Sequence, residues 1–212
     1  MNKKSSAHYQ REFRRRLREQ GLVKKEVWIR PEHAKRLSVI EKQLRKSSVS
    51  TWVNTGDVVM GNANESMTVW TTGSLYEALL NKPLFSEGLA SVELIDGVEP
   101  SLLVVMKEYG DLPVFVTVAG EQIIAESVLW SKDEVTDVAG FNDAVLRTHK
   151  YFPLSTISLD AMPDGQDYYH MFGALSATSL LDNIVFEIEV LATNVIQATE
   201  AYGEFLASPV DS

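Results

Sequence analysis

The stretch LDNIVFEIEVLATNVIQATEAYGEF, residues 181–205, decides the fold. Apolar residues recur along it in steps of three and four, a period that places them on one face of a single helix. They are Leu181, Ile184, Ile188, Leu191, Val195, Ala198, Tyr202 and Phe205. We expect this seam to cover one face of a sheet, and a dimer seam is the alternative. In both cases the interaction helix carries Leu181, Ile184, Ile188, Leu191, Val195, Tyr202 and Phe205.

The residues before this helix alternate between strand-like runs and two helices. Runs rich in β-branched and aromatic residues occupy 90–95, 102–108, 113–119, 122–130, 156–159 and 168–175. Short connections between such runs predict antiparallel pairing. Ser74 and Glu77 have capping-box spacing and open a helix that Pro83 ends, and 138–148 forms another. The order α-β-β-β-β-α-β-β-α predicts an α+β fold, an antiparallel sheet with helices on one face.

The body resembles the YjfI family of bacterial proteins of unknown function. DYYHMFGALS at 167–176, with 184–188 and 194–198 of the last helix, carries the resemblance, which spans about 66–206. The element order is also similar to type III secretion chaperones, small acidic dimers that bind protein partners. Because YjfI-like proteins accompany PspA-type membrane-stress proteins, the resemblance implies a role beside an envelope-stress system. It supplies no catalytic residues.

Charge separates the first 46 residues from the rest. They hold 15 of the 20 basic and 5 of the 29 acidic residues, a formal charge of +10 against −19 for the remainder. Such asymmetry points to a segment that binds a polyanion. We expect a basic arm at 1–46, a linker at 47–66, where serine, asparagine, glycine and threonine are frequent, and an acidic body at 67–212.

The arm is predicted to form a helix, a strand and a second helix. Tyr9, Phe13 and Leu17 form a narrow apolar stripe on the first helix, and 24–30 has a β-branched and aromatic centre. This order resembles a ribbon-helix-helix DNA-binding unit, although no second long helix follows Lys46. The predicted nucleic-acid contacts are Arg11, Arg14, Arg15, Arg18, Lys24, Lys25, Glu26, Trp28 and Arg30. An arm packed on acidic protein surface is the alternative, and the thin apolar stripe argues against membrane binding.

Chemistry-bearing patterns are absent from the sequence. There is no cysteine, and His8, His33, His149 and His170 lack the spacing of metal ligands. We therefore expect no metal, no cofactor and no enzyme activity, with the strand around Tyr168 and His170 as the place for a catalytic alternative. The lack of cysteine, of a long apolar run and of a signal-peptide core predicts a cytoplasmic protein.

Two functional hypotheses follow. In the first, the protein is a regulatory adaptor whose arm contacts DNA while the body forms a homodimer and binds a protein partner. In the second, it is a protein-interaction module alone, and its arm packs on an acidic surface of its own body or of a neighbour.

Overall fold

The computed structural model describes residues 6–24, 26–27, 37, 40–41, 44–45 and 69–207. Two compact units divide the chain, Met1–Arg16 with Met67–Ser212, and Leu17–Ser66. Helix α1 spans Ser6–Glu19, so the first part of the basic segment folds with the acidic body. The linker predicted at 47–66 lies outside the described residues.

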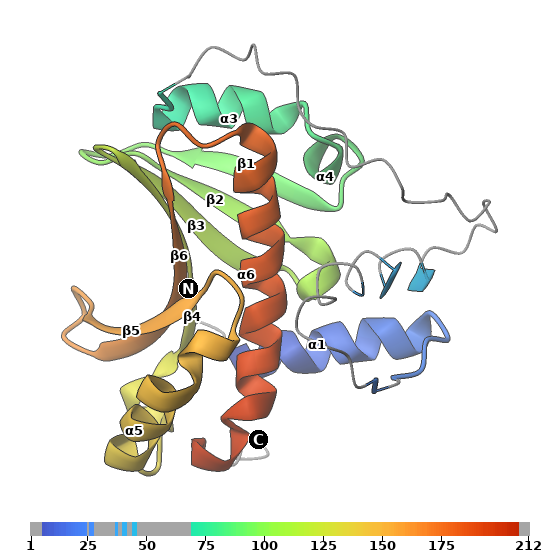
Figure 1. Cartoon of the computed structure of the whole chain (residues 1–212), viewed down its shortest axis with the longest axis vertical. Coiled ribbons are helices and arrows are strands. Elements are labelled where there is room, and N and C mark those ends of the chain that lie inside the picture. The colour runs from blue at the N-terminus through green and yellow to red at the C-terminus, as the bar shows by residue number, and fades with distance from the viewer. Residues whose placement is uncertain are drawn as a thin grey trace. The chain divides into compact units, whose positions relative to one another are not determined.

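An antiparallel sheet of six strands forms the centre of the body (Figure 1). Its spatial order is β1-β2-β3-β4-β6-β5, and all neighbours run antiparallel. The strands are β1 (Ala90–Ile95), β2 (Ser101–Met106), β3 (Leu112–Ala119), β4 (Gln122–Ser131), β5 (Thr156–Ala161) and β6 (Asp167–Ser176). This architecture confirms the predicted α+β class.

The helices that pack on the strands lie on one side of the sheet (Figure 1). The α-helices of the body are α3 (Thr72–Leu80), α4 (Pro83–Ser86), α5 (Val138–Thr148) and α6 (Leu181–Ala201). Short 3-10 turns join them: η2 (Lys107–Tyr109), η3 (Lys132–Glu134), η4 (His149–Tyr151) and η5 (Gly203–Phe205). None of the described helices is long and apolar enough to cross a bilayer.

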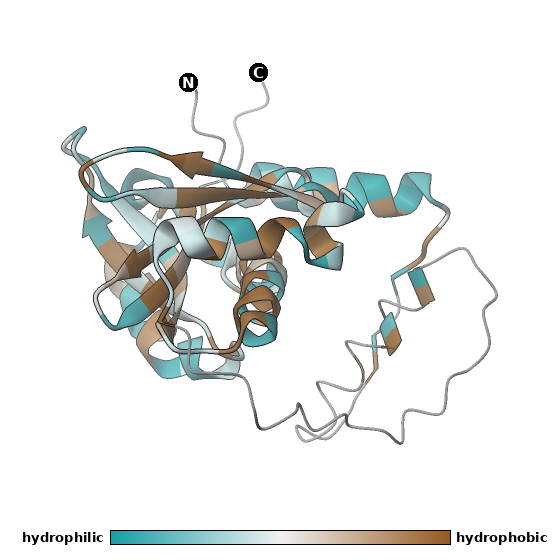
Figure 2. Cartoon of the chain, turned by 90° about the horizontal axis from the view of Figure 1, so that it is seen from above, coloured by the Kyte–Doolittle hydropathy of each residue, from teal (hydrophilic) through white to brown (hydrophobic). Residues whose placement is uncertain are grey.

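The seam of α6 supplies much of the core. Ile184, Ile188, Leu191 and Val195 are fully buried, which at about 2 kcal/mol each contributes about 8 kcal/mol before the entropy of ordering is subtracted. The seam therefore covers the sheet, the first of the two predicted uses, and these side chains of the interaction helix lie inside the body. Figure 2 colours the residues by hydropathy: the strands and α6 contain many hydrophobic residues, whereas α1 is mostly hydrophilic.

The ends of several elements differ from the predicted ones. Strand β2, predicted to reach 108, stops at Met106, because the turn η2 begins at Lys107. Helix α6 stops at Ala201, with Tyr202 as its C-cap, because Gly203 follows and glycine disfavours helix continuation. Thr71, rather than Ser74, is the N-cap of α3, and Ser74, the third residue of the helix, is its partner in the capping box. Pro83 opens α4 at its first turn, where a missing N–H costs nothing.

A bulge in β4 increases the apolar area facing the helices. The register shifts between Val128 and Trp130, so Leu129 and Trp130, though consecutive, are both buried. Phe141 of α5 lies edge-on to Trp130 at 5.7 Å and to Tyr169 at 4.7 Å between ring centroids. These contacts fix α5 against the end of the sheet.

Candidate functional site

Helix α1 packs on the body through its polar and aromatic side chains. Gln10 is buried, and its Nε2 donates to the carbonyl of Ile196 in α6 at 3.1 Å. Phe13 is also buried and stacks on Tyr109 of η2, with ring centroids 5.2 Å apart and an interplanar angle of 3°. The predicted apolar stripe thus serves, at Phe13, as a contact with the body.

Ion pairs surround this aromatic contact. Arg14 lies 2.9 Å from Glu200, and Arg16 lies 2.8 Å from Asp111 and also donates to the carbonyl of Lys107. The hydrogen bond to Asp111 raises the pKa of Arg16. Within α1, the hydrogen bond from Arg15 is the main cause that lowers the pKa of Glu12 to about 2. Part of the arm's positive charge is therefore matched by acidic groups of the same chain.

A tight turn before β3 lets α1 approach closely. Gly110 has φ +78°, and a Cβ there would stand 2.9 Å from both the Cβ of Glu12 and the carbonyl oxygen of Tyr9. Asp111 follows with φ 65°, a conformation that costs energy for a residue with a side chain. Its carboxylate pairs with Arg16, so the strained turn supplies both the space and a charged partner for α1.

The predicted nucleic-acid contacts fall into separate groups. Arg11, Arg15 and Arg18 are exposed on α1, whereas Arg14 is half-buried. Lys24 and Glu26 form an exposed ion pair at 3.1 Å and lie in coil rather than in the predicted strand. Lys25, Trp28 and Arg30 lie outside the described residues. The recognition strand predicted at 24–30 therefore lies largely outside the described residues, and the nucleic-acid contacts stay a prediction.

The other side of the sheet carries an apolar surface that the sequence analysis missed. Cross-strand pairs run from β2 to β6 on the side away from the helices, including Leu103 with Phe115, Phe115 with Glu126, and Glu126 with Phe172. We call this surface the open face and define it by Leu103, Val105, Pro113, Phe115, Ile124, Glu126, Val128, His170 and Phe172. The seven apolar members are half-buried.

The signal for the open face is present in the sequence. A sheet with one solvated face shows alternating apolar and polar residues, whereas one buried on both faces shows unbroken apolar runs. Strands β2 and β3 read SLLVVM and LPVFVTVA, the second kind of pattern. The residues of β2 on the helix side, Leu102, Val104 and Met106, are buried. Leu103 and Val105 thus place further apolar surface where no described helix packs.

Glu126 and His170 lie among these apolar side chains. His170 is 6% exposed, and neither ring nitrogen has a hydrogen-bond partner among the described residues. Its Nδ1 stands 3.5 Å from Oε2 of Glu126, farther than the roughly 2.7–2.9 Å of a charge-assisted hydrogen bond. The Glu126 side chain keeps 38% of its surface exposed. The open face therefore has an acidic group that a ligand can reach.

The hypothesis of an enzyme that uses β6, around Tyr168 and His170, can be compared with the contacts of that strand. Tyr169 points into the core, donates to Asn142 Oδ1 at 2.7 Å and has a pKa raised by burial. Tyr168 donates to Gln166 in the adjoining turn. Within the described part of the chain, no three histidine, aspartate or glutamate side chains converge as metal ligands. These residues do not form a nucleophile with its base and orienting group.

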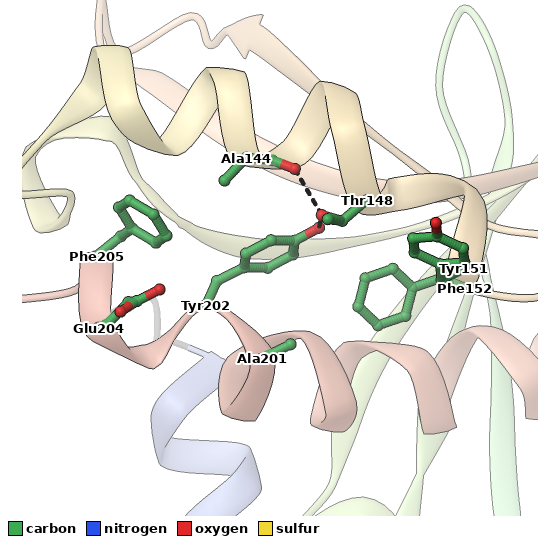
Figure 3. A pocket seen from close by; sticks show the side chains of 8 residues that line it. All are labelled: Ala144, Thr148, Tyr151, Phe152, Ala201, Tyr202, Glu204 and Phe205. Atoms are coloured by element: carbon green, nitrogen blue, oxygen red, sulfur yellow. Dashed lines mark hydrogen bonds between the residues drawn. The ribbon is translucent and has the colours of Figure 1, made fainter.

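An aromatic pocket of about 300 Å³ lies between α5 and the end of α6 (Figure 3). Tyr151, Phe152, Tyr202 and Phe205 line it, with Glu204 at one side. Thr148 donates to the carbonyl of Ala144 at 2.6 Å, so the Tyr202 hydroxyl, 2.8 Å away, donates to Thr148. The hydroxyls of Thr148 and Tyr202 are thus satisfied internally, and the pocket offers a ligand mainly aromatic surface.

Comparison with known proteins finds a family and relatives whose sequences match the body. The DUF2170 family, described as an uncharacterised protein conserved in bacteria, matches residues 69–206. The uncharacterised protein YjfI of Escherichia coli K12 is 32% identical over 107 residues, which cover 50% of this chain and 80% of YjfI. YjfI of Escherichia coli O157:H7 matches with the same identity and coverage.

Two solved structures show a more distant similarity. YbjN from E. coli, proposed to regulate transcription, has a TM-score of 0.48 at 13% identity and covers 68% of this chain and 100% of its own. An uncharacterised protein from Methanothermobacter thermautotrophicus has a TM-score of 0.45 at 15% identity, covering 62% of this chain and 99% of its own. At these values the similarity says nothing about function.

Proposed function

This chain belongs to the DUF2170 family of bacterial proteins, whose description names no reaction. From the surfaces of the chain we propose that it is a non-enzymatic protein-interaction module. The open face binds a protein partner, and α1 packs on the acidic body. The observation that carries the proposal is the half-buried apolar layer of the open face on the side of the sheet away from the helices.

The open face is large enough to form the central part of an interface. With strands about 4.8 Å apart and about 3.3 Å per residue, six residues on each of the four strands β2, β3, β4 and β6 cover roughly 19 by 20 Å, or about 380 Å² before surface relief is counted. Stable interfaces bury about 800 Å² per partner. A mainly apolar patch of a few hundred Å² is often functional, and this supports the open face as the place where another molecule binds.

The contacts of α1 support the second part of the proposal. Gln10, Phe13, Arg14 and Arg16 all contact residues of the body. This is the packing of a basic helix on an acidic protein surface that our second hypothesis describes. A regulatory link to PspA-type envelope-stress proteins remains an implication of the family resemblance.

Site-specific crosslinking tests the proposal, because a chain without cysteine accepts a single reactive site. A benzophenone attached through Thr117→Cys, next to Ile124 in the register, reports on the open face. The same label at Leu146→Cys, on the exposed side of α5, is the matched control. In lysate of the encoding bacterium we expect one discrete adduct from Thr117→Cys, competed by unlabelled protein and lost with Phe115→Asp.

Adducts that form equally from Leu146→Cys, or that persist with Phe115→Asp, would contradict a binding role for the open face. Phe115 faces away from the buried core, so Phe115→Asp should fold. Circular dichroism and the melting temperature check that it does.

A second candidate function rests on the exposed arginines. Positions 11, 15 and 18 share one face of α1, opposite Gln10 and Phe13, and all three side chains are exposed. If each neutralises one DNA phosphate, affinity for random duplex DNA falls about 40-fold between 50 and 200 mM salt. An affinity that ignores salt, or one that replacement of all three arginines by glutamine leaves unchanged, would rule out this contact.

A further inference from the structure

The charges of the sheet indicate the chemistry of the partner. The six strands contain no lysine and no arginine, whereas Glu126 stands near the middle of the open face. Resting on the proposed function of this face, we propose that its partner is a cationic amphipathic helix. The apolar side of that helix packs on Leu103, Phe115, Ile124 and Phe172, and a lysine or arginine pairs with Glu126.

The position of Glu126 explains why the partner must bring positive charge. In the register Glu126 lies between Phe115 on β3 and Phe172 on β6, so an apolar partner would bury its carboxylate between two aromatic side chains. A buried charge is tolerated only when it is paired and hydrogen-bonded. His170 stands 3.5 Å away, farther than a charge-assisted hydrogen bond, so a lysine or arginine of the partner would give Glu126 a closer and permanently charged pair.

The same argument disfavours a second copy of this chain as the occupant. Two open faces packed together would bury two Glu126 carboxylates and two His170 rings, and neither face has a lysine or arginine to offer. Burial of an unpaired charge is strongly unfavourable. If the chain is a homodimer, as its sequence predicts, the dimer should use a different surface.

The dimensions and an existing contact both favour a helix. A helix of about 18 residues is about 27 Å long and about 10–12 Å wide with its side chains, and this fits the open face along its diagonal. The body already binds one basic amphipathic helix, since α1 places Phe13 on Tyr109 and flanks it with two arginine–carboxylate pairs. An apolar centre with charged pairs around it is thus a mode of recognition that this body uses.

The test uses the full chain and a designed peptide of about 18 residues, with leucines at i, i+3, i+4 and i+7 and lysines elsewhere. Fluorescence anisotropy of the labelled peptide gives the affinity. We expect Glu126→Gln to weaken binding about 5- to 20-fold, in the range of one charged contact, and Phe115→Ser to weaken it at least as much. Glu77→Gln and Leu146→Ser, exposed positions on α3 and α5, are the matched controls and should leave the affinity unchanged.

Two further arms separate the possible outcomes. The α1 contact site is acidic as well, so Asp111→Asn with Glu200→Gln should not alter binding; if it does, the peptide binds there and the proposal is wrong. A peptide with the same leucines but glutamates for lysines should bind far more weakly. Equal binding of both peptides, lost with Phe115→Ser, would overturn the charge assignment and leave the proposed function intact.

Light scattering completes the test. A dimer that Phe115→Asp converts into monomer would show a second copy on the open face and overturn the inference. Failure of the cationic peptide to bind would also overturn it. If Thr117→Cys gives no specific adduct either, the proposed function fails too.

Discussion

Glu187 is a carboxyl group buried in the core. It lies on α6, is 1% exposed, and its Oε1 has no hydrogen-bond partner among the described residues. A Cβ on Gly173 would stand only 1.6 Å from that oxygen, so the glycine provides the space that the carboxyl occupies. Burial raises the pKa of Glu187 to about 7, and the group is largely protonated in the folded protein at weakly acidic pH.

This pKa predicts a pH-dependent stability. The folded state holds the proton up to about pH 7, whereas the unfolded chain releases it near 4.5. The contribution of Glu187 to stability is therefore greatest below pH 4.5 and decreases by about 3 kcal/mol as pH rises to 7. Relative to wild type, Glu187→Gln should gain that amount in urea unfolding at pH 8 and almost nothing at pH 4. Glu77→Gln, an exposed control, should show no such trend, and a flat difference for Glu187→Gln would contradict the prediction.

Gly110 allows a second residue-scale prediction. Gly110→Ala introduces a Cβ that collides with Glu12 and Tyr9, so α1 should detach and residues 6–16 should exchange amide hydrogen faster. Gly120→Ala is the matched control, because Gly120 also has positive φ (60°) but nothing within 4 Å. Both variants should lose about 1 kcal/mol to backbone strain. Equal exchange of α1 in the two variants would show that the close contact does not hold the helix.

At the residue scale, the sequence could predict that Glu187 lies beside the apolar seam of the last helix, but not which residues surround its carboxyl group. Helical geometry places it beside the seam of Ile184, Ile188 and Leu191, with Glu189 on the far side. The sequence did not show that Gly173 would lie opposite the carboxyl, because this depends on the position of α6 over β6. The open face was missed for a similar reason, since Phe115 and Glu126 become neighbours only through the β3–β4 register.

At the scale of elements, the start of α6 lacks a side-chain cap. Leu180 occupies the N-cap position with extended φ and ψ, makes no capping hydrogen bond and is 51% exposed. Leu180→Ser would accept a hydrogen bond from the first turn and should stabilise the protein by about 0.5–2 kcal/mol. The melting temperature measures this, and Leu180→Ala is the control that removes the leucine without adding a cap. A serine variant no more stable than the alanine variant would refute the effect.

The contacts of α1 predict an order of importance among its side chains. Phe13 is buried and stacked, so Phe13→Ala should cost about 3 kcal/mol or more of packing. Arg14 and its partner Glu200 are 39% and 50% exposed, and such pairs contribute about 0–1 kcal/mol. Amide exchange of residues 6–16 should therefore increase more in Phe13→Ala than in Arg14→Gln. The reverse order would mean that charge holds the helix.

Sequence periodicity predicted the elements of the body better than their ends or their exposed sides. The strands and helices follow the predicted order, because short hairpin connections leave few ways to pair such runs. The last helix was predicted to reach 205, but it ends at Ala201, where Gly203 interrupts an apolar period that otherwise continues. The helical state of Leu37, Ile40, Glu41, Leu44 and Arg45 agrees with the second helix predicted for the arm.

For the whole molecule, the sequence shows a positive N-terminal segment and a negative remainder, and in the folded structure some of these opposite charges form ion pairs with each other. The sequence separates a positive segment from a negative remainder, and the structure shows Arg14 and Arg16 paired with Glu200 and Asp111 of that remainder. Ion pairs between residues about a hundred or more positions apart leave no trace in composition or periodicity. The proposed partner of the open face follows the same rule, positive charge bound at an acidic and apolar surface.

An environment-sensitive fluorophore on Thr117→Cys tests this account most directly, because Thr117 lies on β3 beside the open-face residue Ile124. Addition of the leucine–lysine peptide to the labelled full chain should shift the emission to shorter wavelength with saturation, as the fluorophore leaves water. Glu126→Gln should move the midpoint to higher peptide concentration, and the label on Leu146→Cys should not respond. An unchanged spectrum at Thr117→Cys, or an equal shift at Leu146→Cys, would contradict the account.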